Sequence, residues 1–426
     1  MEKGHEADVV VVGLGTAGSA VSAFLAEGGL RVLAIDRRPL DEAGARWVNG
    51  VPQWMFRESG VAQPEAPELR GNGQPFHLVC GLGPSRVVLR DTGLLEVDMR
   101  HLVARLQERA RLAGARLLGE VTVTGREGSA LQTSAGIIES AYVIDASGLG
   151  GSGLVPPTSP GPDHLCAAAQ GVYEVTDLEA AQAYMARHQV EPGDTLCFTG
   201  IAGGFSILNV RLHDGRLSVL TGSIPGQGHP SGKSILDSFV AEQAWVGARV
   251  FGGARAIPLS RPVDRLVEGN VALLGDAARQ VFTVHGSGIG IGMIAARTLA
   301  NTLLAGDPLD AYGYRWMRSF GALQGTYEVF RRFTAELSVD EIRDLVDTGL
   351  MNAQTAGPTL AQRWPSPSLS GWLRSLIGAV RRPRLAARLV AVGSRMAVVR
   401  GLYGRYPRDP GELGAWSRKI ERALPL

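Results

Sequence analysis

The sequence predicts an α/β fold whose main sheet is assembled from segments at both ends of the chain. A β-branched run at residues 8–12 leads through a glycine turn into a helical pattern. The same succession of strand, glycine turn and helix returns from residue 271. Between the two, short strand-like segments alternate with turns. We therefore expect a mainly parallel sheet covered by helices, with a second, antiparallel sheet inserted into it.

The first predicted unit begins with a strand at residues 8–12 and a helix at residues 19–27 that ends at Gly28 and Gly29. A second strand follows at residues 31–35. Further along, a helix is predicted at residues 102–112. Strands are predicted at residues 117–124 and 137–144.

Residues 150–162 are rich in Gly, Pro and Ser and predict a domain boundary. The block after it has strand patterns at residues 206–211 and 217–222 and one helical pattern at residues 234–249. A strand at residues 271–274 and a helix at residues 289–305 then complete the first unit. We predict a discontinuous first domain at residues 1–160 and 263–310, with strand pieces near 80–90. An α+β domain with an antiparallel sheet at residues 161–262 and a helical region at residues 311–426 complete the chain.

Composition limits the function. The chain has 426 residues, 45% of them hydrophobic, and a net charge of +2, which describes a globular protein and gives no reason to expect nucleic-acid binding. Three scattered cysteines predict neither a disulfide framework nor a metal site. Residues 280–296 form the longest uncharged stretch, but four glycines interrupt it. With no signal-peptide pattern at the start, we expect a cytoplasmic protein.

The first glycine turn has the spacing of a dinucleotide-binding motif. Gly13 permits the tight turn, Gly15 lets the backbone approach a pyrophosphate, and Gly18 lets the helix pack closely on the strand. The helix N-terminus, including Thr16 and Ala17, offers unpaired N–H groups to the phosphates. Asp36 ends the second strand, where a carboxylate can accept hydrogen bonds from both ribose hydroxyls, and Arg37 follows it. This arrangement predicts a Rossmann-type domain.

The second half of the chain favours FAD over NAD. Gly275 and Asp276 end a buried strand, and a glycine-rich turn then opens a helix. An aspartate there can hold the ribityl hydroxyls, and a helix N-terminus can face the flavin edge that becomes negative on reduction. The candidate contacts in this turn are Gly286, Gly288, Ile289 and Gly290.

Taken together, the motif of Gly13, Gly15 and Gly18 and the run Gly275-Asp276-Ala277-Ala278 resemble a flavoprotein superfamily. It comprises group A monooxygenases, lycopene cyclases, flavin halogenases and geranylgeranyl reductases. The resemblance implies an FAD-binding domain of the glutathione-reductase/p-hydroxybenzoate-hydroxylase type. It also implies further FAD contacts, and the residues that we assign to them are Arg100, Val121, Asp145, Ala146 and Gly148.

The C-terminal part is most similar to the geranylgeranyl-reductase-like branch. Its patterns are Tyr314-x-Trp316, Leu337-Ser-Val-Asp-Glu-Ile-Arg-Asp-Leu and Tyr406-Pro407-x-x-Pro410. The branch implies reduction of an alkene by hydride from reduced flavin. A group A monooxygenase, which transfers an oxygen atom from O₂, is the alternative. A redox-neutral, flavin-bound cyclase or binding protein is a second one.

Four departures from the superfamily patterns bear on these alternatives. No arginine follows the turn from Asp145 to Gly148, which puts direct use of NAD(P)H in doubt and leaves room for another electron donor. Residues 203–209 lack the Trp and Pro that line an isoprenoid channel, so the substrate is not an ordinary geranylgeranyl lipid. No lysine lies between Lys3 and Lys233, which argues against halogenation. Finally, Thr283-Val284-His285 replaces a proline before the last glycine loop.

Three residues are candidates for the reaction itself. His285 precedes the loop expected to face the flavin and can act as a general acid or polarising donor; alternatively it only shapes the turn. Arg46 and Trp47 follow the second strand and can approach the flavin, with ordinary packing as the alternative for Trp47. We expect a bulky, largely apolar small molecule in a cavity between the two sheets.

The segment at residues 372–408 is basic and carries apolar residues at helical spacing, including Trp372, Leu376 and Val380. Such a helix can contact an anionic membrane surface or a hydrophobic carrier, or it can pack on the first domain with its arginines in solvent.

Overall fold

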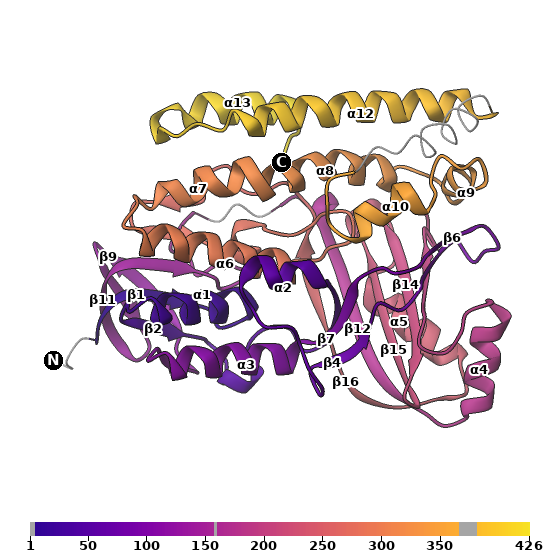
Figure 1. The fold of residues 1–426 in the computed structure, drawn as a ribbon, viewed down its shortest axis with the longest axis horizontal. Helices are drawn as coiled ribbons and strands as arrows, with labels where there is room; N and C mark the ends of the chain where they lie inside the picture. Colours follow the sequence, from indigo (N-terminus) through magenta and orange to yellow (C-terminus); the bar gives the residue numbers. More distant parts are fainter. Residues whose placement is uncertain (1–4, 157–159, 366–380) are drawn as a thin grey trace.

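The computed structural model describes residues 5–156, 160–365 and 381–426. Figure 1 shows two sheet-containing lobes side by side, with the C-terminal helices laid across both. The apolar positions 372–380 of the basic segment lie outside the described residues. No helix in the described part of the chain is both long and apolar enough to cross a bilayer.

The first lobe has an eight-stranded sheet, and its strand order β17-β18-β11-β1-β2-β8 brings the two ends of the chain together. The parallel strands of this sheet are β1 (His5–Val12), β2 (Val32–Ile35), β8 (Arg116–Leu118), β11 (Gly136–Asp145) and β18 (Val271–Leu273). The antiparallel strands are β17 (Val267–Glu268), β10 (Ala130–Thr133) and β9 (Val123–Glu127). The predicted Rossmann-type sheet is confirmed. The single strand expected at residues 117–124 is divided between β8 and β9.

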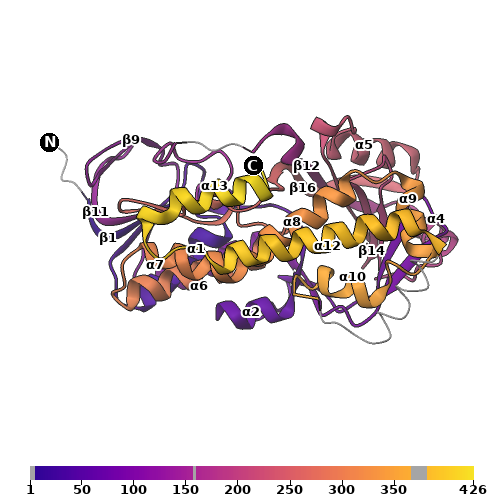
Figure 2. The same cartoon turned by 90° about the horizontal axis from the view of Figure 1, so that it is seen from above.

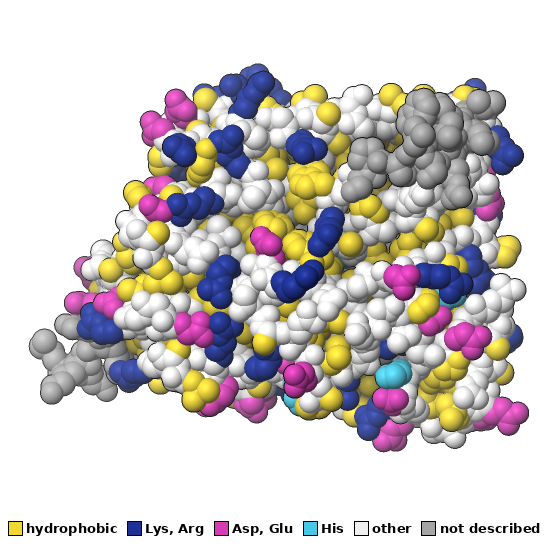
Figure 3. Space-filling model, in the orientation of Figure 1, with side chains coloured by type: hydrophobic (Ala, Val, Ile, Leu, Met, Phe, Trp, Pro, Cys, Tyr) yellow, Lys and Arg dark blue, Asp and Glu magenta, His cyan; other side chains and the backbone are white. Residues whose placement is uncertain are grey.

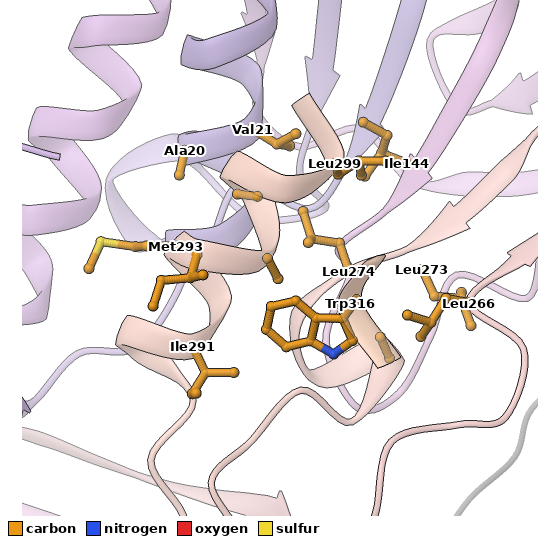
Figure 4. Close-up of a cluster of buried hydrophobic side chains, with 14 of the residues drawn as sticks. Ala20, Val21, Ile144, Leu266, Leu273, Leu274, Ile291, Met293, Leu299 and Trp316 are labelled. Atoms are coloured by element: carbon orange, nitrogen blue, oxygen red, sulfur yellow. The ribbon is translucent and has the colours of Figure 1, made fainter. Parts of the chain in front are cut away.

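Three helices cover this sheet. Helix α1 (Thr16–Glu27) packs against both α3 (Met99–Leu112) and α6 (Ile289–Leu304). A hydrophobic cluster joins these elements to the C-terminal region: Trp316 is fully buried, close to Ile291 and Leu274 (Figure 4). The helices that follow are therefore part of the same core as the first lobe.

The second lobe is a seven-stranded sheet in the order β16-β12-β15-β14-β13-β5-β6. Its strands are β12 (Leu165–Val175), β13 (Thr195–Thr199), β14 (Ser206–His213), β15 (Arg216–Ser223), β16 (Val246–Pro258), β5 (Phe76–Cys80) and β6 (Arg86–Leu89). Strands β5 and β6 are the pieces near residues 80–90 that we assigned to the first domain, and β5 instead pairs in parallel with β13. A local strand pattern cannot reveal which sheet a strand joins.

The helices of the second lobe also differ from the prediction. Helix α5 (Gly232–Glu242) ends within the predicted helix at residues 234–249, and β16 begins at Val246. Gln243 at the C-cap has an extended backbone with φ −110° and ψ 97°, which ends the helix. The sequence reading missed α4 (Leu178–Arg187), which Asp177 caps by accepting a hydrogen bond from the Ala180 N–H.

A small third sheet lies between the lobes. It contains β3 (Val48–Pro52), β7 (Leu94–Asp98) and β4 (Leu69–Asn72), and α2 (Gln53–Ser59) follows β3. The side-chain amide of Gln170, on β12, both donates to and accepts from the backbone of Val48. This contact ties the third sheet to the second lobe.

The remaining helices form the outer layer seen from above in Figure 2. They are α7 (Asp310–Trp316), α8 (Ala322–Ala335), α9 (Val339–Asp347), α10 (Ala353–Leu360), α12 (Pro383–Gly404) and α13 (Leu413–Ala423). Helix α12 packs on α8 and α13, so the described part of the basic segment is docked on the protein itself. Acidic and basic side chains are interspersed on the face shown in Figure 3.

Candidate cofactor and substrate site

A cavity opens where the two glycine turns of the first lobe meet. Its lining combines segments from both halves of the first lobe with residues of β16 from the second. The residues that line it include Gly13, Gly15, Thr16, Ala17, Asp36, Arg37, Trp47, Asn49, Ala146, Gly148, Arg255, Gly275, Asp276, Gly286, Gly288 and Ile289. The cavity is thus built on the two motifs that the sequence analysis selected.

The first glycine turn is held by close backbone packing. Gly13 has φ +99°, and a Cβ there would collide with the Ala146 carbonyl oxygen. A Cβ on Gly18 would collide with the Gly13 carbonyl oxygen. Gly15 is the N-cap of α1 and lines the cavity with Thr16. The unpaired N–H groups at the start of α1 are therefore available to a phosphate.

Asp36 lines the cavity and also holds the glycine turn. One carboxylate oxygen accepts from the Leu14 N–H at 2.7 Å, and the other accepts from the Arg38 N–H at 2.9 Å. The remaining lone pairs of the carboxylate can accept hydrogen bonds from ribose hydroxyls. The same side chain thus positions the phosphate turn and offers the sugar contact.

Asp276 shows that the cavity fits the ribityl part of FAD. Its carboxylate lines the cavity, and no described residue is seen to donate a hydrogen bond to it. Burial raises its pKa above the ordinary value, opposed by the positive charge of Arg255. A buried carboxylate without protein donors fits a ligand that supplies hydroxyl donors.

The second glycine turn precedes α6. Gly286 has φ +68°, and a Cβ on Gly288 would lie 3.2 Å from the Asp276 Oδ1. Both glycines line the cavity. The N-terminus of α6 therefore reaches the same cavity as the N-terminus of α1, which is the paired arrangement that FAD requires.

A second cavity lies beside the first, and Asn49 lines both. It is enclosed by the third sheet, by the seven-stranded sheet and by the C-terminal end of α10. Its lining is Val48, Asn49, Gly50, Asn72, Gln74, Phe76, Leu94, Glu96, Gln170, Thr195, Ile207, Asn209, Arg211, Ser218, Leu220, His285, Ser287 and Leu360.

The second glycine turn forms part of the wall between the two cavities. Gly286 and Gly288 line the cofactor cavity, whereas His285 and Ser287 line the second cavity. Alternate residues of one short loop thus line the two cavities. This loop and Asn49 are therefore shared by the linings of the two cavities.

Comparison with known proteins gives a consistent result, although no family model matches the chain. A digeranylgeranylglycerophospholipid reductase of Sulfolobus acidocaldarius is 26% identical over 98% of this chain and 97% of its own length. The reductase of that name from Methanothrix thermoacetophila is 27% identical over 80% of this chain and 90% of its own. These likenesses agree with the geranylgeranyl-reductase-like resemblance of the sequence.

Solved structures extend the likeness in fold. A geranylgeranyl bacteriochlorophyll reductase-like protein of Thermoplasma acidophilum superposes with a TM-score of 0.73 at 18% identity, covering 92% of this chain and all of that one. The Diels-Alderase of pyrroindomycin biosynthesis has a TM-score of 0.60 at 20% identity, covering 84% of this chain and 81% of that one. At these identities the solved structures show a shared fold, and the relatives named above are reductases, in agreement with the oxidoreductase expected from the sequence.

Besides His285, which lines the second cavity, six residues that we assigned to FAD or to the reaction lie outside the cofactor cavity. They are Gly18, Arg46, Arg100, Val121, Asp145 and Gly290. Gly18 packs α1 onto the turn, as predicted for its role. Gly290 packs on Met55, with which a Cβ there would collide.

The other four have partners within the protein. Arg100 forms an ion pair with Asp98 and stacks over the Phe251 ring at 3.6 Å. Arg46 donates to the Asp41 carbonyl and is exposed. Asp145 accepts hydrogen bonds from the Ser147 and Ser152 side chains and so shapes the turn before Gly148. Val121 donates its N–H to the Asp36 carbonyl.

We did not assign eight further residues of the lining from the sequence: Arg38, Gly44, Ala45, Ser147, Arg255, Ala256, Ile257 and Val281. Arg255 is the most informative of them, because it reaches the cavity from β16 of the second lobe and donates to the Gly44 carbonyl. Burial lowers its pKa, while Asp276 and Asp36 raise it. Its strand carries no local signal for nucleotide binding. The fold alone brings it to the cavity.

His285 is placed to act as a hydrogen-bond acceptor. Its Nε2 donates to the Thr359 carbonyl at 3.2 Å, and burial lowers the pKa of its imidazole to about 4. The ring is therefore neutral at physiological pH, with its proton on Nε2 and a lone pair on Nδ1. Although His285 lines the second cavity, as expected for a residue near the reaction, this state does not suit the general-acid role that we considered for it.

Proposed function

We propose that the protein reduces a carbon–carbon double bond of an isoprenoid-like small molecule that binds in the second cavity. The observation that carries this proposal is the shared wall of the two cavities, where residues 285–288 face both sides and Asn49 lines both. The relatives that span nearly the whole chain are reductases of isoprenoid lipids, which supports the reaction type.

Reduced FAD would supply a hydride to one alkene carbon while a proton from water adds to the other, so that two electrons pass to the product. The protein has to bind the alkene, exclude bulk water and leave a route for that proton. Trp47 is buried in the cofactor cavity wall and excludes water there. Ser287 lines the second cavity, and its hydroxyl has no partner among the described residues. We assign to Ser287 the relay of the proton, because His285 is neutral.

The electron donor is a separate part of the proposal. The turn from Asp145 to Gly148 carries no arginine, and we expect slow direct reduction by NADH or NADPH. Photoreduction or dithionite would then serve as the reductant in the laboratory.

The test is an anaerobic single-turnover experiment. The reduced holoenzyme is mixed with a geranylgeranyl-bearing diether lipid, and flavin absorbance and product mass are followed together. We expect flavin reoxidation and a gain of two hydrogens per turnover. If products form only when O₂ is admitted and carry an added oxygen atom, the protein is a monooxygenase and the proposal is wrong.

A second candidate is ring closure without net redox change. A dialkyldecalin synthase of Streptomyces rugosporus is 24% identical over 70% of this chain and 65% of its own length, which favours this candidate. With a linear polyene substrate, a cyclase would give a product of unchanged mass with no flavin reoxidation. The same anaerobic assay separates the two candidates.

A further inference from the structure

Polar side chains interrupt the mainly apolar lining of the second cavity. Apolar residues such as Val48, Phe76, Ile207, Leu220 and Leu360 form one part of its lining. The rest carries amide, hydroxyl and charged groups, namely Asn49, Asn72, Gln74, Glu96, Gln170, Thr195, Asn209, Arg211, Ser218, His285 and Ser287. A ligand that matches this lining has both an apolar and a polar part.

The charge of the single cation of the described lining is balanced by a carboxylate, although its Nη2 has no hydrogen-bond partner and lies against Gly71. Arg211 forms an ion pair with Glu96, and its Nε donates to the Gly193 carbonyl at 2.8 Å. The Arg211 side chain is only 6% exposed, whereas that of Glu96 is 21% exposed. Glu96, whose carboxylate accepts hydrogen bonds, is therefore the more accessible member of the pair. His285 adds no positive charge, because its imidazole is neutral.

The cofactor cavity of the same protein provides the contrast. Three arginines, Arg37, Arg38 and Arg255, line it, as suits a pyrophosphate. The second cavity has one paired arginine in a wall of comparable size. An anionic head group placed there would meet the Glu96 carboxylate without a free cation to balance it.

Two further acceptors lack partners. The Asn209 Oδ1 and the Ser287 Oγ are buried, line the cavity and accept no hydrogen bond from the described residues. Hydroxyl or amide donors of a ligand can satisfy both atoms, whereas the Glu96 carboxylate already accepts from the Thr195 Oγ1 at 3.4 Å and pairs with Arg211. Arg211 is 95% buried, being 5% exposed as a residue, so the pair is a built part of the wall rather than a surface contact.

We propose that the second cavity binds an amphiphile whose polar part is uncharged and donates hydrogen bonds from hydroxyl or amide groups, and that it selects against phosphate-bearing lipids. This inference rests on the proposed function for the alkene-bearing part of the ligand. It differs from the phospholipid that the names of the relatives describe.

The test compares two probes that differ only in charge: digeranylgeranylglycerol and its phosphate ester. Binding to the oxidised holoenzyme is measured by perturbation of the flavin absorbance, so no turnover is needed. We expect the neutral probe to bind at least about tenfold more tightly, because the phosphate meets the negative charge of the Glu96 carboxylate. Equal or tighter binding of the phosphate ester by the unaltered protein, or binding of neither probe, overturns the inference.

The variant Glu96→Gln should narrow or reverse this preference, because it leaves Arg211 as an unbalanced positive charge. Glu242→Gln, at the exposed end of α5, is the matched control and should keep the wild-type ratio. An unchanged ratio in a folded Glu96→Gln protein would also overturn the inference. If the neutral probe binds preferentially but is never reduced, the proposed function fails and the head-group inference stands.

Discussion

The side-chain amide of Gln170 replaces a strand neighbour for Val48: its Oε1 accepts from the Val48 N–H at 2.6 Å and its Nε2 donates to the Val48 carbonyl at 2.8 Å. The two residues belong to β12 and β3, and Gln170 is 3% exposed. Trp47 and Asn49, on either side of Val48, line the cofactor cavity. One amide thus holds the segment at residues 47–49, which lines both cavities.

Gln170→Glu should therefore weaken both stability and FAD binding. The carboxylate cannot donate to the Val48 carbonyl, and it places a charge in a buried site. We expect a loss of about 1–3 kcal/mol in the free energy of unfolding. Chemical denaturation of the holoprotein and FAD titration of the apoprotein measure the two effects. Gln182→Glu on the exposed face of α4 is the control, and equal stabilities of the two variants would contradict the role of Gln170.

Asp36→Ala should weaken FAD binding by about 1.5–3 kcal/mol, because it removes a charged acceptor from the ribose position. It also frees the Leu14 N–H that the carboxylate holds at 2.7 Å. Asp36→Asn retains one acceptor oxygen and should lose less. FAD titration of the apoproteins gives the comparison. Wild-type affinity in Asp36→Ala would show that the carboxylate does not contact the cofactor.

The sequence could predict the parts of the site in which strand, turn and helix are contiguous. Gly13, Asp36, Asp276 and Gly288 belong to such units and lie where the motif places them. Arg100 was assigned by resemblance alone, and Asp98 and Phe251 hold it away from the cavity lining.

The parts that sequence could not predict depend on contacts between distant segments. Arg255 reaches the cofactor cavity from a strand of the inserted sheet. Glu96 and Arg211 meet across two sheets, although each resembles an ordinary strand residue in the sequence. For this reason the polar groups that interrupt the mainly apolar lining of the second cavity were visible only in the fold.

Gly288→Val should reduce FAD occupancy by filling space rather than by straining the backbone. The φ of Gly288 is −107°, which other residues can adopt. A Cβ there would lie 3.2 Å from both the Asp276 Oδ1 and the Val281 Cγ2, and valine adds two methyl groups beyond it. The ratio of flavin to protein absorbance measures occupancy. Gly253→Val, where a Cβ meets no atom within 4 Å, is the control. Full occupancy in Gly288→Val would exclude this turn from the flavin site.

His285→Gln should change how stability depends on pH. Burial lowers the pKa of the His285 imidazole in the folded protein to about 4, from its ordinary value of 6.5. Between these values the unfolded chain binds a proton that the folded protein does not, so stability falls as pH drops from 6.5 toward 4. The full shift corresponds to about 3 kcal/mol at most. Gln can still donate to the Thr359 carbonyl, and the variant should lose less stability than the wild type over this range.

Denaturation curves at pH 7, 6, 5 and about 4 measure this difference. His213→Gln, at an exposed position on β14, should follow the wild-type curve. The same variants test the neutral state of His285 in the reaction, because a neutral acceptor predicts no loss of rate as pH rises through 6.5. A rate that falls through that range in the wild type but not in His285→Gln would require a protonated imidazole, and His285 would then act as the general acid.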